Sequence, residues 1–264
     1  MTMFGSQWLA NAGSTYEIEQ SVRFNSVDDA KLSRTPDSDG STTTFTISLW
    51  VKRSTTTIIN SMYQGFSGTS SAGNLRWLLD GRLQFYDNDG TGNGLLTTAL
   101  FRDPSSWYHI VAIWDTSNAT STDRLRLYSN GDRITSFDSS TFPAVNYATT
   151  YFNRSAYVQQ IGFTSSGSTY SDFLLAEYNF IDGTAVEPSS FGETNSDTGQ
   201  WVPKEYEGSY GTNGFYLKGQ DSSALGDDTS GNGNDFSSSG LFANDQMSDS
   251  PTSNHCTWNP LQTG

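Results

Sequence analysis

The sequence predicts an all-β protein, an antiparallel β-sandwich of the jelly-roll type with an irregular C-terminal extension. Apolar runs with strand-like alternation recur at nearly even spacing, and almost no stretch has helical periodicity. Two Gly-containing turns separate alternating runs, which is typical of hairpins. The composition agrees, because 14% of the residues are aromatic, only 16% are charged, and 25 are glycines. Many short strands joined by polar turns have such a composition.

The first predicted strands precede residue 54. Residues 17–24 alternate so that Ile18, Val22 and Phe24 share one face of a strand. Residues 45–53 form the clearest strand. The side chains that alternate along it are Phe45, Ile47, Leu49 and Val51 on one face and Thr46, Ser48, Trp50 and Lys52 on the other. Between the two, the sequence predicts a turn that carries a short strand.

Two hairpins are predicted next. Asp80-Gly81 separates runs at 75–79 and 82–86, and Asn130-Gly131 separates runs at 124–128 and 132–137. Both dipeptides suit a two-residue type I′ turn, which requires positive φ.

Three further strands complete the predicted sandwich. Residues 107–114 are apolar on nearly both faces, which indicates a central strand, and another strand follows at 157–163. Residues 173–180 form the closing strand. We expect a tight turn at Asp182-Gly183 after it, and then a short helical turn near Pro188.

The net charge bears on the possible partners, and the single cysteine bears on disulfide bonding. A formal net charge of −14 disfavours nucleic acid and anionic membranes as partners. Cys256 is the one cysteine, so no intrachain disulfide forms. The chain has no apolar run of membrane-spanning length, and its first residues do not resemble a signal peptide.

The chain divides into three predicted parts. Residues 1–16 form an arm that docks on a partner through Phe4 and Trp8, since exposed aromatics are efficient interface anchors. Residues 17–193 form the sandwich domain. Residues 194–264 form an extended segment, which either adds to the same sandwich or begins a further domain.

Several segments together resemble a laminin-G-like domain of the concanavalin A-like lectin/glucanase superfamily. They are Phe45-Thr-Ile-Ser-Leu-Trp-Val-Lys, Trp107-Tyr-His-Ile-Val-Ala-Ile-Trp-Asp, Leu125-Arg-Leu-Tyr-Ser-Asn-Gly, Gln160-Ile-Gly-Phe and Leu174-Leu-Ala-Glu-Tyr-Asn-Phe-Ile-Asp-Gly. The resemblance covers about residues 17–193. It implies a jelly roll with a lectin-like role.

The later segments 199–217, 227–236 and 245–254 resemble virion structural and tail-fibre proteins of tailed phages, of the marine phage type. This resemblance implies a virion component, either a tail or head fibre or a capsid decoration, assembled in the host cytoplasm. Other virion proteins would contact the N-terminal arm. The domain would form a homo-oligomer and would touch a glycan of the host surface.

No catalytic constellation is present, so we expect no enzyme activity. Glucanases of the superfamily carry paired carboxylates as Glu-x-Asp-x-x-Glu, which is missing here. Glu177 and Asp182 are five residues apart and are expected on opposite faces of a strand. His109 lies within the central strand and is expected to be a strand residue with satisfied hydrogen bonds. A glycanase that depends on Glu177 is the least favoured alternative.

A carbohydrate-binding module, free or linked to an enzyme, is the main alternative to a virion protein. Flat aromatic rings stack on sugar rings. The candidate rings for glycan binding are Tyr63, Phe66, Tyr86, Tyr147, Tyr151 and Tyr170, with Trp50 as a further one. Calcium is the one cofactor that the polar turns could hold, through Asp87, Asp89, Asp227 and Asp228.

Overall fold

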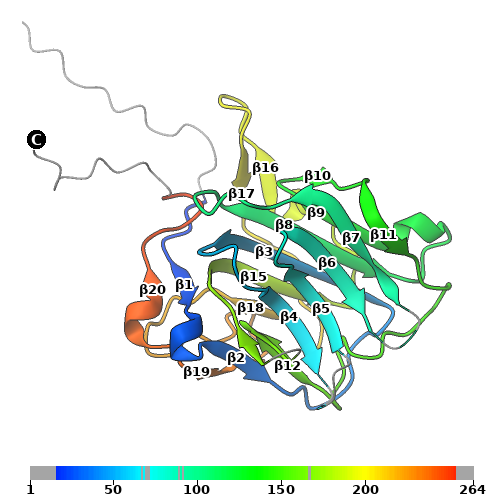
Figure 1. The fold of residues 1–264 in the computed structure, drawn as a ribbon, viewed down its shortest axis with the longest axis horizontal. Coiled ribbons are helices and arrows are strands. Elements are labelled where there is room, and N and C mark those ends of the chain that lie inside the picture. The colour runs from blue at the N-terminus through cyan, green and yellow to red at the C-terminus, as the bar shows by residue number, and fades with distance from the viewer. Residues whose placement is uncertain are drawn as a thin grey trace, which may run out of the picture.

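Two antiparallel β-sheets pack face to face in the computed structural model (Figure 1). The structure describes residues 16–66, 68, 72–88, 90, 92–165 and 168–253. The helical segments in this part of the chain are short 3-10 turns. The predicted all-β sandwich is therefore confirmed.

The first sheet, called sheet A, has the strand order β10-β9-β8-β3-β15-β1-β20, and β18 also pairs with β15. The two longest strands, β3 and β15, lie side by side at its centre. Its strands are β1 (Ser21–Phe24), β3 (Thr44–Arg53), β8 (Tyr108–Asp115), β9 (Leu125–Ser129), β10 (Asp132–Arg133), β15 (Phe173–Asp182), β18 (Phe215–Leu217) and β20 (Gln246–Met247).

The second sheet, called sheet B, has the order β11-β7-β6-β5-β4-β12-β2-β19. Its strands are β2 (Lys31–Arg34), β4 (Asn60–Phe66), β5 (Ala72–Trp77), β6 (Arg82–Asp87), β7 (Asn93–Leu100), β11 (Phe137–Thr141), β12 (Val158–Ile161) and β19 (Ser237–Ser239). Outside the two sheets lie the small hairpins β13 (Phe163–Thr164) with β14 (Thr169–Tyr170) and β16 (Gly192–Thr194) with β17 (Trp201–Pro203), and the turns η1 (Ser26–Asp28), η2 (Ser121–Asp123), η3 (Pro188–Ser190) and η4 (Ala243–Asp245).

One aromatic core fills the space between the sheets. Period-two alternation turns one face of each strand inward, so Phe45 of sheet A meets Phe85 of sheet B at a ring distance of 6.4 Å. Phe152 enters this core from a loop and stacks on Phe45 at 5.2 Å. Gly73 leaves the room for it, because a Cβ there would lie 2.6 Å from Cε2 of Phe152.

The predicted hairpins are present, but their turns differ. Asn130 and Gly131 have φ of 51° and 84°, as a type I′ turn between β9 and β10 requires. At the other hairpin only Gly81 has positive φ, and its amide donates to the Leu78 carbonyl. That turn is therefore a three-residue loop with glycine in the left-handed position.

Two strand predictions were wrong in part. The first strand begins only at Ser21, and Ile18 packs on the outer face of sheet A while Val22 lies in the main core. Residues 132–137 do not form one strand, because the chain crosses from β10 in sheet A to β11 in sheet B. By contrast, Gly183 has a φ of 82° directly after β15, and η3 begins at the expected Pro188.

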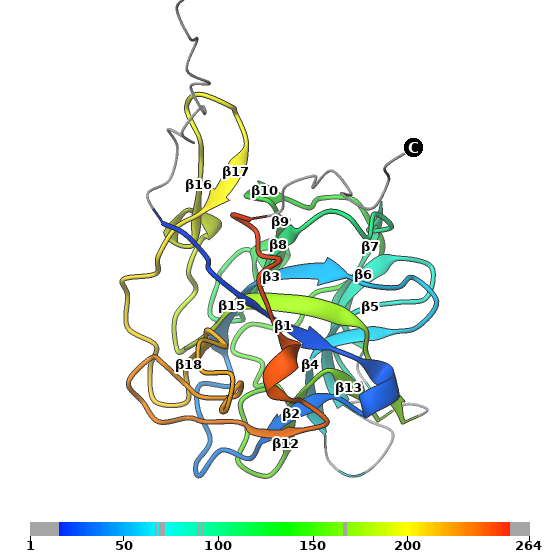
Figure 2. The ribbon, with the colours of Figure 1, turned by 90° about the vertical axis from the view of Figure 1, so that its left-hand side faces the viewer.

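The C-terminal segment adds strands to both sheets. β18 pairs with β15, β19 with β2, and β20 with β1. Figure 2 shows β20 beside β1 and β18 beside β15. The described part of this segment, residues 194–253, thus contributes strands to sheet A and to sheet B. Within the described ranges, no helix is long and apolar enough to cross a membrane.

Candidate binding face

The outer face of sheet A is covered by other parts of the chain. Val111 and Ile181 on this face are buried against Phe191, which lies beyond the closing strand. Trp50 and Trp107 are buried nearby with Ile18, from the segment before β1. This face is therefore closed by the protein's own chain.

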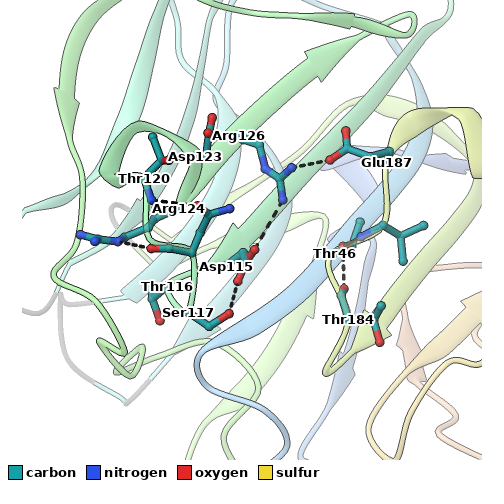
Figure 3. Close-up of polar contacts among 12 residues, drawn as sticks. Thr46, Asp115, Thr116, Ser117, Thr120, Asp123, Arg124, Arg126, Thr184 and Glu187 are labelled. Carbon is teal, nitrogen blue, oxygen red and sulfur yellow. Dashed lines mark hydrogen bonds and ion pairs between the residues drawn. The ribbon is translucent and has the colours of Figure 1, made fainter.

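Polar contacts fasten the segment that follows β15 across this face (Figure 3). The Thr46 hydroxyl donates to the Thr184 carbonyl over 2.9 Å and accepts from the Val186 amide over 2.9 Å. Further along, the Arg126 guanidinium lies between Asp115 and Glu187 and pairs with both carboxylates (Figure 3). The segment that follows β15, residues 184–187, is therefore held to both β3 and β9.

Glu187 also accepts a hydrogen bond from the Tyr128 hydroxyl over 2.7 Å. Burial and the neighbouring Glu187 carboxylate raise the pKa of Tyr128 to about 12. The phenol therefore stays protonated and keeps donating at any ordinary pH.

Glu177 lies beneath this covering in a closed network. Its φ is 52°, and it lies where a β-bulge interrupts the pairing of β15 with β3. Its carboxylate accepts hydrogen bonds from the hydroxyls of Tyr16, over 2.7 Å, and Tyr216. Burial raises the pKa of Glu177, and the hollow beside it has no volume that admits water. Glu177 is 8% exposed in this network.

Asp182 has a separate set of partners at the end of the sandwich. It accepts from the Ser41 amide over 2.7 Å, from Nδ2 of Asn153 over 2.6 Å and from the Asn213 amide over 3.0 Å. Glu177 shares none of these partners. The two carboxylates therefore do not flank a common site, as a glycosidase requires.

His109 has both ring nitrogens satisfied. Trp201 donates its indole N–H to Nδ1 of His109, and Nε2 lies 2.9 Å from the Ser48 hydroxyl. Because an indole can only donate, Nδ1 is an acceptor and Nε2 carries the proton. Burial lowers the pKa of His109 to about 3, so the ring is neutral.

The outer face of sheet B carries a row of amide side chains. Strand register places Gln160, Gln64 and Asn74 side by side across β12, β4 and β5. Nε2 of Gln64 donates to Oδ1 of Asn74 over 3.1 Å, and the Ser165 amide donates to Gln64 over 2.9 Å. The β13–β14 hairpin therefore covers this end of the row.

The row continues into a more open group that we call the platform, defined by Arg76, Gln84, Tyr86 and Leu96. All four are half-buried side chains on β5, β6 and β7, with Gln84 opposite both Arg76 and Leu96. Tyr86 lies opposite Gly94, where an added Cβ would meet its Cδ2 at 2.7 Å, so part of the ring packs close to this glycine. The half-buried ring lies beside the polar side chains of the platform.

The remaining candidate rings lie elsewhere. Tyr63 is fully buried in the core, so it is not a surface ring, and Trp50 is buried beneath the covering of sheet A. Tyr147 donates to Asp87 over 3.1 Å, and Tyr151 packs against the Tyr157 ring.

The last two candidates lie at the periphery of sheet B. Tyr170 packs against Phe163 at 5.0 Å in the covering hairpin. Phe66 ends β4 and is half-buried. Tyr86 is therefore the half-buried candidate ring on the platform, and its cross-strand partner Gly94 leaves the space that part of the ring occupies.

Three of the calcium candidates, Asp87, Asp227 and Asp228, lie within the described residues. Asp87 is buried and accepts from the amides of Thr150, over 2.8 Å, and Tyr151, over 3.1 Å. Asp228 accepts from the Tyr216 amide over 2.8 Å, and Asp227 beside it is exposed.

No group of three or more acidic, histidine or cysteine side chains that could hold a metal occurs among the described residues. Asp89, Phe4 and Trp8 lie outside the described residues.

A cleft of about 400 Å³ opens at the edge of the sandwich where the chain crosses between the sheets. Its apolar floor is continuous with the core, and its rim carries an ion pair between Arg133 and Asp123. The lining residues are Thr122, Asp123, Leu125, Arg133, Ile134, Thr135, Phe137, Ser140 and Phe142.

Comparison with known proteins gives one family match. The model of the family described as the concanavalin A-like lectin/glucanases superfamily matches residues 26–188. No curated protein matches the chain.

Among solved structures, a heptameric SAP-like pentraxin from Limulus polyphemus is 13% identical, over 65% of this chain and 80% of that one, with a TM-score of 0.44. Domains LG4-5 of the mouse laminin α1 chain are 12% identical, over 80% of this chain and 50% of that one, with a TM-score of 0.44. Domain 4 of an extracellular arabinanase from Geobacillus stearothermophilus, in complex with arabinotriose, is 18% identical, over 56% and 65% of the two chains, with a TM-score of 0.42.

Proposed function

Because the chain belongs to the concanavalin A-like lectin/glucanase superfamily, we propose that it is a lectin-like domain that binds a glycan without cleaving it. The binding face is the outer face of sheet B. The observation that carries this proposal is Tyr86, a half-buried ring that packs close to Gly94 on the same face as the side chains of Arg76 and Gln84.

The platform has the chemistry that sugar recognition needs. The C–H face of a pyranose stacks on a flat aromatic ring, and its hydroxyls pair with donors and acceptors around the ring. Tyr86 supplies the ring, while the half-buried Gln84 supplies an amide group on the same face of the sheet. A sheet surface of this kind suits an extended oligosaccharide.

The arrangement of carboxylates supports binding without hydrolysis. A glycosidase holds two carboxyl groups roughly 5–10 Å apart around one bond. Glu177 is enclosed by Tyr16 and Tyr216, and Asp182 ties three loops together. Each has a structural role in the sandwich.

The setting that we propose is a phage virion, as a fibre component or a capsid decoration. The resemblance of segments 199–217, 227–236 and 245–254 to tailed-phage proteins motivates it. The path of the described chain supports it. The Ile18 amide donates to Thr252 over 2.9 Å, so both ends of the described chain run together along the sheet A side. An arm attached there would leave the sheet B face free.

A glycan array tests the binding function. The intact protein should bind a subset of glycans, and Tyr86→Ala should lower the affinity about five- to tenfold because the stacking surface is lost. Tyr86→Phe keeps the ring and should bind nearly as well. Phe242→Ala removes an exposed ring at another place and is the control. An array with no bound glycan would disprove the binding function.

Mass spectrometry of purified particles tests the setting. The chain should be present in virions, and replacing Phe4 and Trp8 by alanine should reduce its incorporation. If the chain is absent from particles yet binds glycans, the carbohydrate-binding module alternative replaces the virion proposal.

A further inference from the structure

Arg76 is a cation on the platform without a carboxylate partner. Its Nε donates to Oε1 of Gln84 over 2.8 Å, and this is its one hydrogen bond within the described part of the chain. Burial lowers the pKa of Arg76. The guanidinium is thus half-desolvated and not neutralised by an acid.

The chain has 28 acidic and 14 basic residues, and most of the basic side chains have a carboxylate or a backbone carbonyl as partner. Among the described residues, Arg76 shares the lack of both with Arg34, which pairs with side-chain amides, and with Lys31 and Lys218, which lie over aromatic rings. Many cations of the described chain pair with carboxylates, namely Arg23, Lys52, Arg82, Arg126, Arg133 and Arg154. Others are occupied by backbone carbonyls, as Arg53 is by Phe101 and Arg124 by Pro143. Arg76 has neither kind of partner among the described residues.

The orientation of Arg76 leaves its terminal nitrogens available. Gln84 holds the Nε edge, which limits rotation of the planar guanidinium. Neither Nη atom is among the buried polar atoms that lack a partner, so both reach solvent. A held guanidinium with two open donors matches the two oxygens of a carboxylate or sulfate in a bidentate pair.

We propose that Arg76 recognises an acidic sugar, so that the glycan bound on the platform carries a uronate carboxylate or a sulfate group. This inference rests on the proposed glycan-binding function and names the substrate class. The sugar ring stacks on Tyr86, and its oxyanion pairs with the Nη atoms of Arg76. Gln84 is a positioning residue, because it acts by holding Nε.

The pairing is local and does not require a basic surface. The net charge of −14 repels a polyanion at long range, but salt screens exposed charges beyond about 10 Å at 0.1 M. The contact with Arg76 acts at hydrogen-bond distance on a half-buried group, where screening is weaker. Arg76 therefore sets specificity rather than overall attraction.

The test compares an acidic oligosaccharide with its own uncharged form. Oligogalacturonate and its methyl ester differ only in the carboxylate, a sulfated galactan oligosaccharide supplies the other oxyanion, and unsulfated galactan is its neutral match. Isothermal titration with the intact protein should show binding of one acidic form at least tenfold tighter than its neutral match. A difference between oligogalacturonate and its methyl ester would identify the recognised group as a carboxylate. A difference between sulfated and unsulfated galactan would identify it as a sulfate.

Variants assign the preference to Arg76. Arg76→Gln should lower the affinity for the acidic form about ten- to hundredfold, to the level of its neutral match. Arg76→Lys should recover part of the loss, because an ammonium keeps the charge but not the bidentate geometry. Gln84→Ala should weaken the preference less. Arg102→Gln, at an arginine that contacts the Asp80 carbonyl outside the platform, should change nothing.

The outcomes separate the two proposals. Equal affinity for the acidic and neutral forms, or a preference that survives Arg76→Gln, overturns the role of Arg76 and leaves glycan binding intact. If the intact protein binds no oligosaccharide on a glycan array, both the glycan-binding function and the role of Arg76 are overturned. Thermal unfolding of each variant shows whether it is folded. The comparison of oligogalacturonate with its methyl ester uses the intact protein, so it does not depend on the folding of any variant.

Discussion

Nε1 of Trp201 donates a hydrogen bond to Nδ1 of His109 over 3.0 Å, which joins the β16–β17 hairpin to the central strand β8. The two residues are 92 positions apart in the chain. The same indole lies over Gly131, where a Cβ would meet it at 2.5 Å. One side chain thus fixes the hairpin to strand β8 and to the turn between β9 and β10.

We expect stability to fall on acidification because His109 is buried and neutral. Its pKa is lowered from 6.5 to about 3 in the folded protein, so between these values the unfolded chain binds the proton first. The free energy of unfolding should therefore decrease as pH falls from about 6.5 to 3, by at most about 1.4 kcal/mol per pH unit from this group. Urea titrations at several pH values measure it.

The control for this prediction is His109→Gln. Its amide oxygen can accept from Trp201 and its amide nitrogen can donate to Ser48, but it does not titrate. The slope of stability against pH should be smaller in the variant over this range. Identical slopes would show that His109 does not cause the loss.

Glu177→Gln should stabilise the protein at pH 8 by about 1 kcal/mol. Burial raises the pKa of Glu177, so the stability from its protonated form is present below about 4.5 and is lost as pH rises. The glutamine oxygen still accepts from Tyr16 and Tyr216 and has no charge to desolvate. Differential scanning calorimetry at pH 4 and pH 8 should show the gain at pH 8 alone. Glu193→Gln at an exposed glutamate is the control.

Asp182→Ala should destabilise the protein by about 3 kcal/mol. The carboxylate accepts from Ser41, Asn153 and Asn213, and alanine leaves these donors without their acceptor. Asp182→Asn should recover part of the loss because one amide oxygen remains. Chemical denaturation measures the change. A loss as small as that of the exposed Asp132→Ala variant would contradict the role of Asp182 as a junction.

Gly73→Ala should destabilise the protein by about 1–3 kcal/mol, because the added methyl group overlaps the Phe152 ring. The ring is packed between the sheets and has no free direction in which to move. Combining Gly73→Ala with Phe152→Leu should give less than the sum of the two single effects, since the smaller side chain leaves room. Strict additivity in urea unfolding would show that the two sites are independent.

The strands that alternate most clearly are the ones that sequence predicts best. β3 and β8 lie where residues 45–53 and 107–114 indicate them, and all of β8 pairs with β3 from Thr44 to Val51. Prediction is weaker where the chain leaves one sheet for the other. Phe137 continues the alternation of the preceding residues, yet it pairs with Thr97 of sheet B. Alternation of apolar residues predicts that one face of a strand is buried, but it does not predict to which sheet the strand belongs.

The candidate site was predictable only in part. Tyr86 could be named as a candidate because aromatic rings stack on sugars. Tyr63 was a candidate for the same reason, but it is buried in the core. Arg76 carried no sequence signal, because its lack of a carboxylate partner depends on which residues surround it. Only the register of β5 with β6 places Gln84 against its Nε.

By itself the sequence determined an all-β sandwich, its central strands and its hairpins, because these depend on side-chain alternation and local turn preferences. The tertiary structure decided which face is open. Segments distant in the sequence, around Ile18 and Trp201, cover sheet A, and the platform of sheet B keeps Tyr86 and Arg76 half-exposed. Such covering depends on long-range packing between residues that no local pattern links.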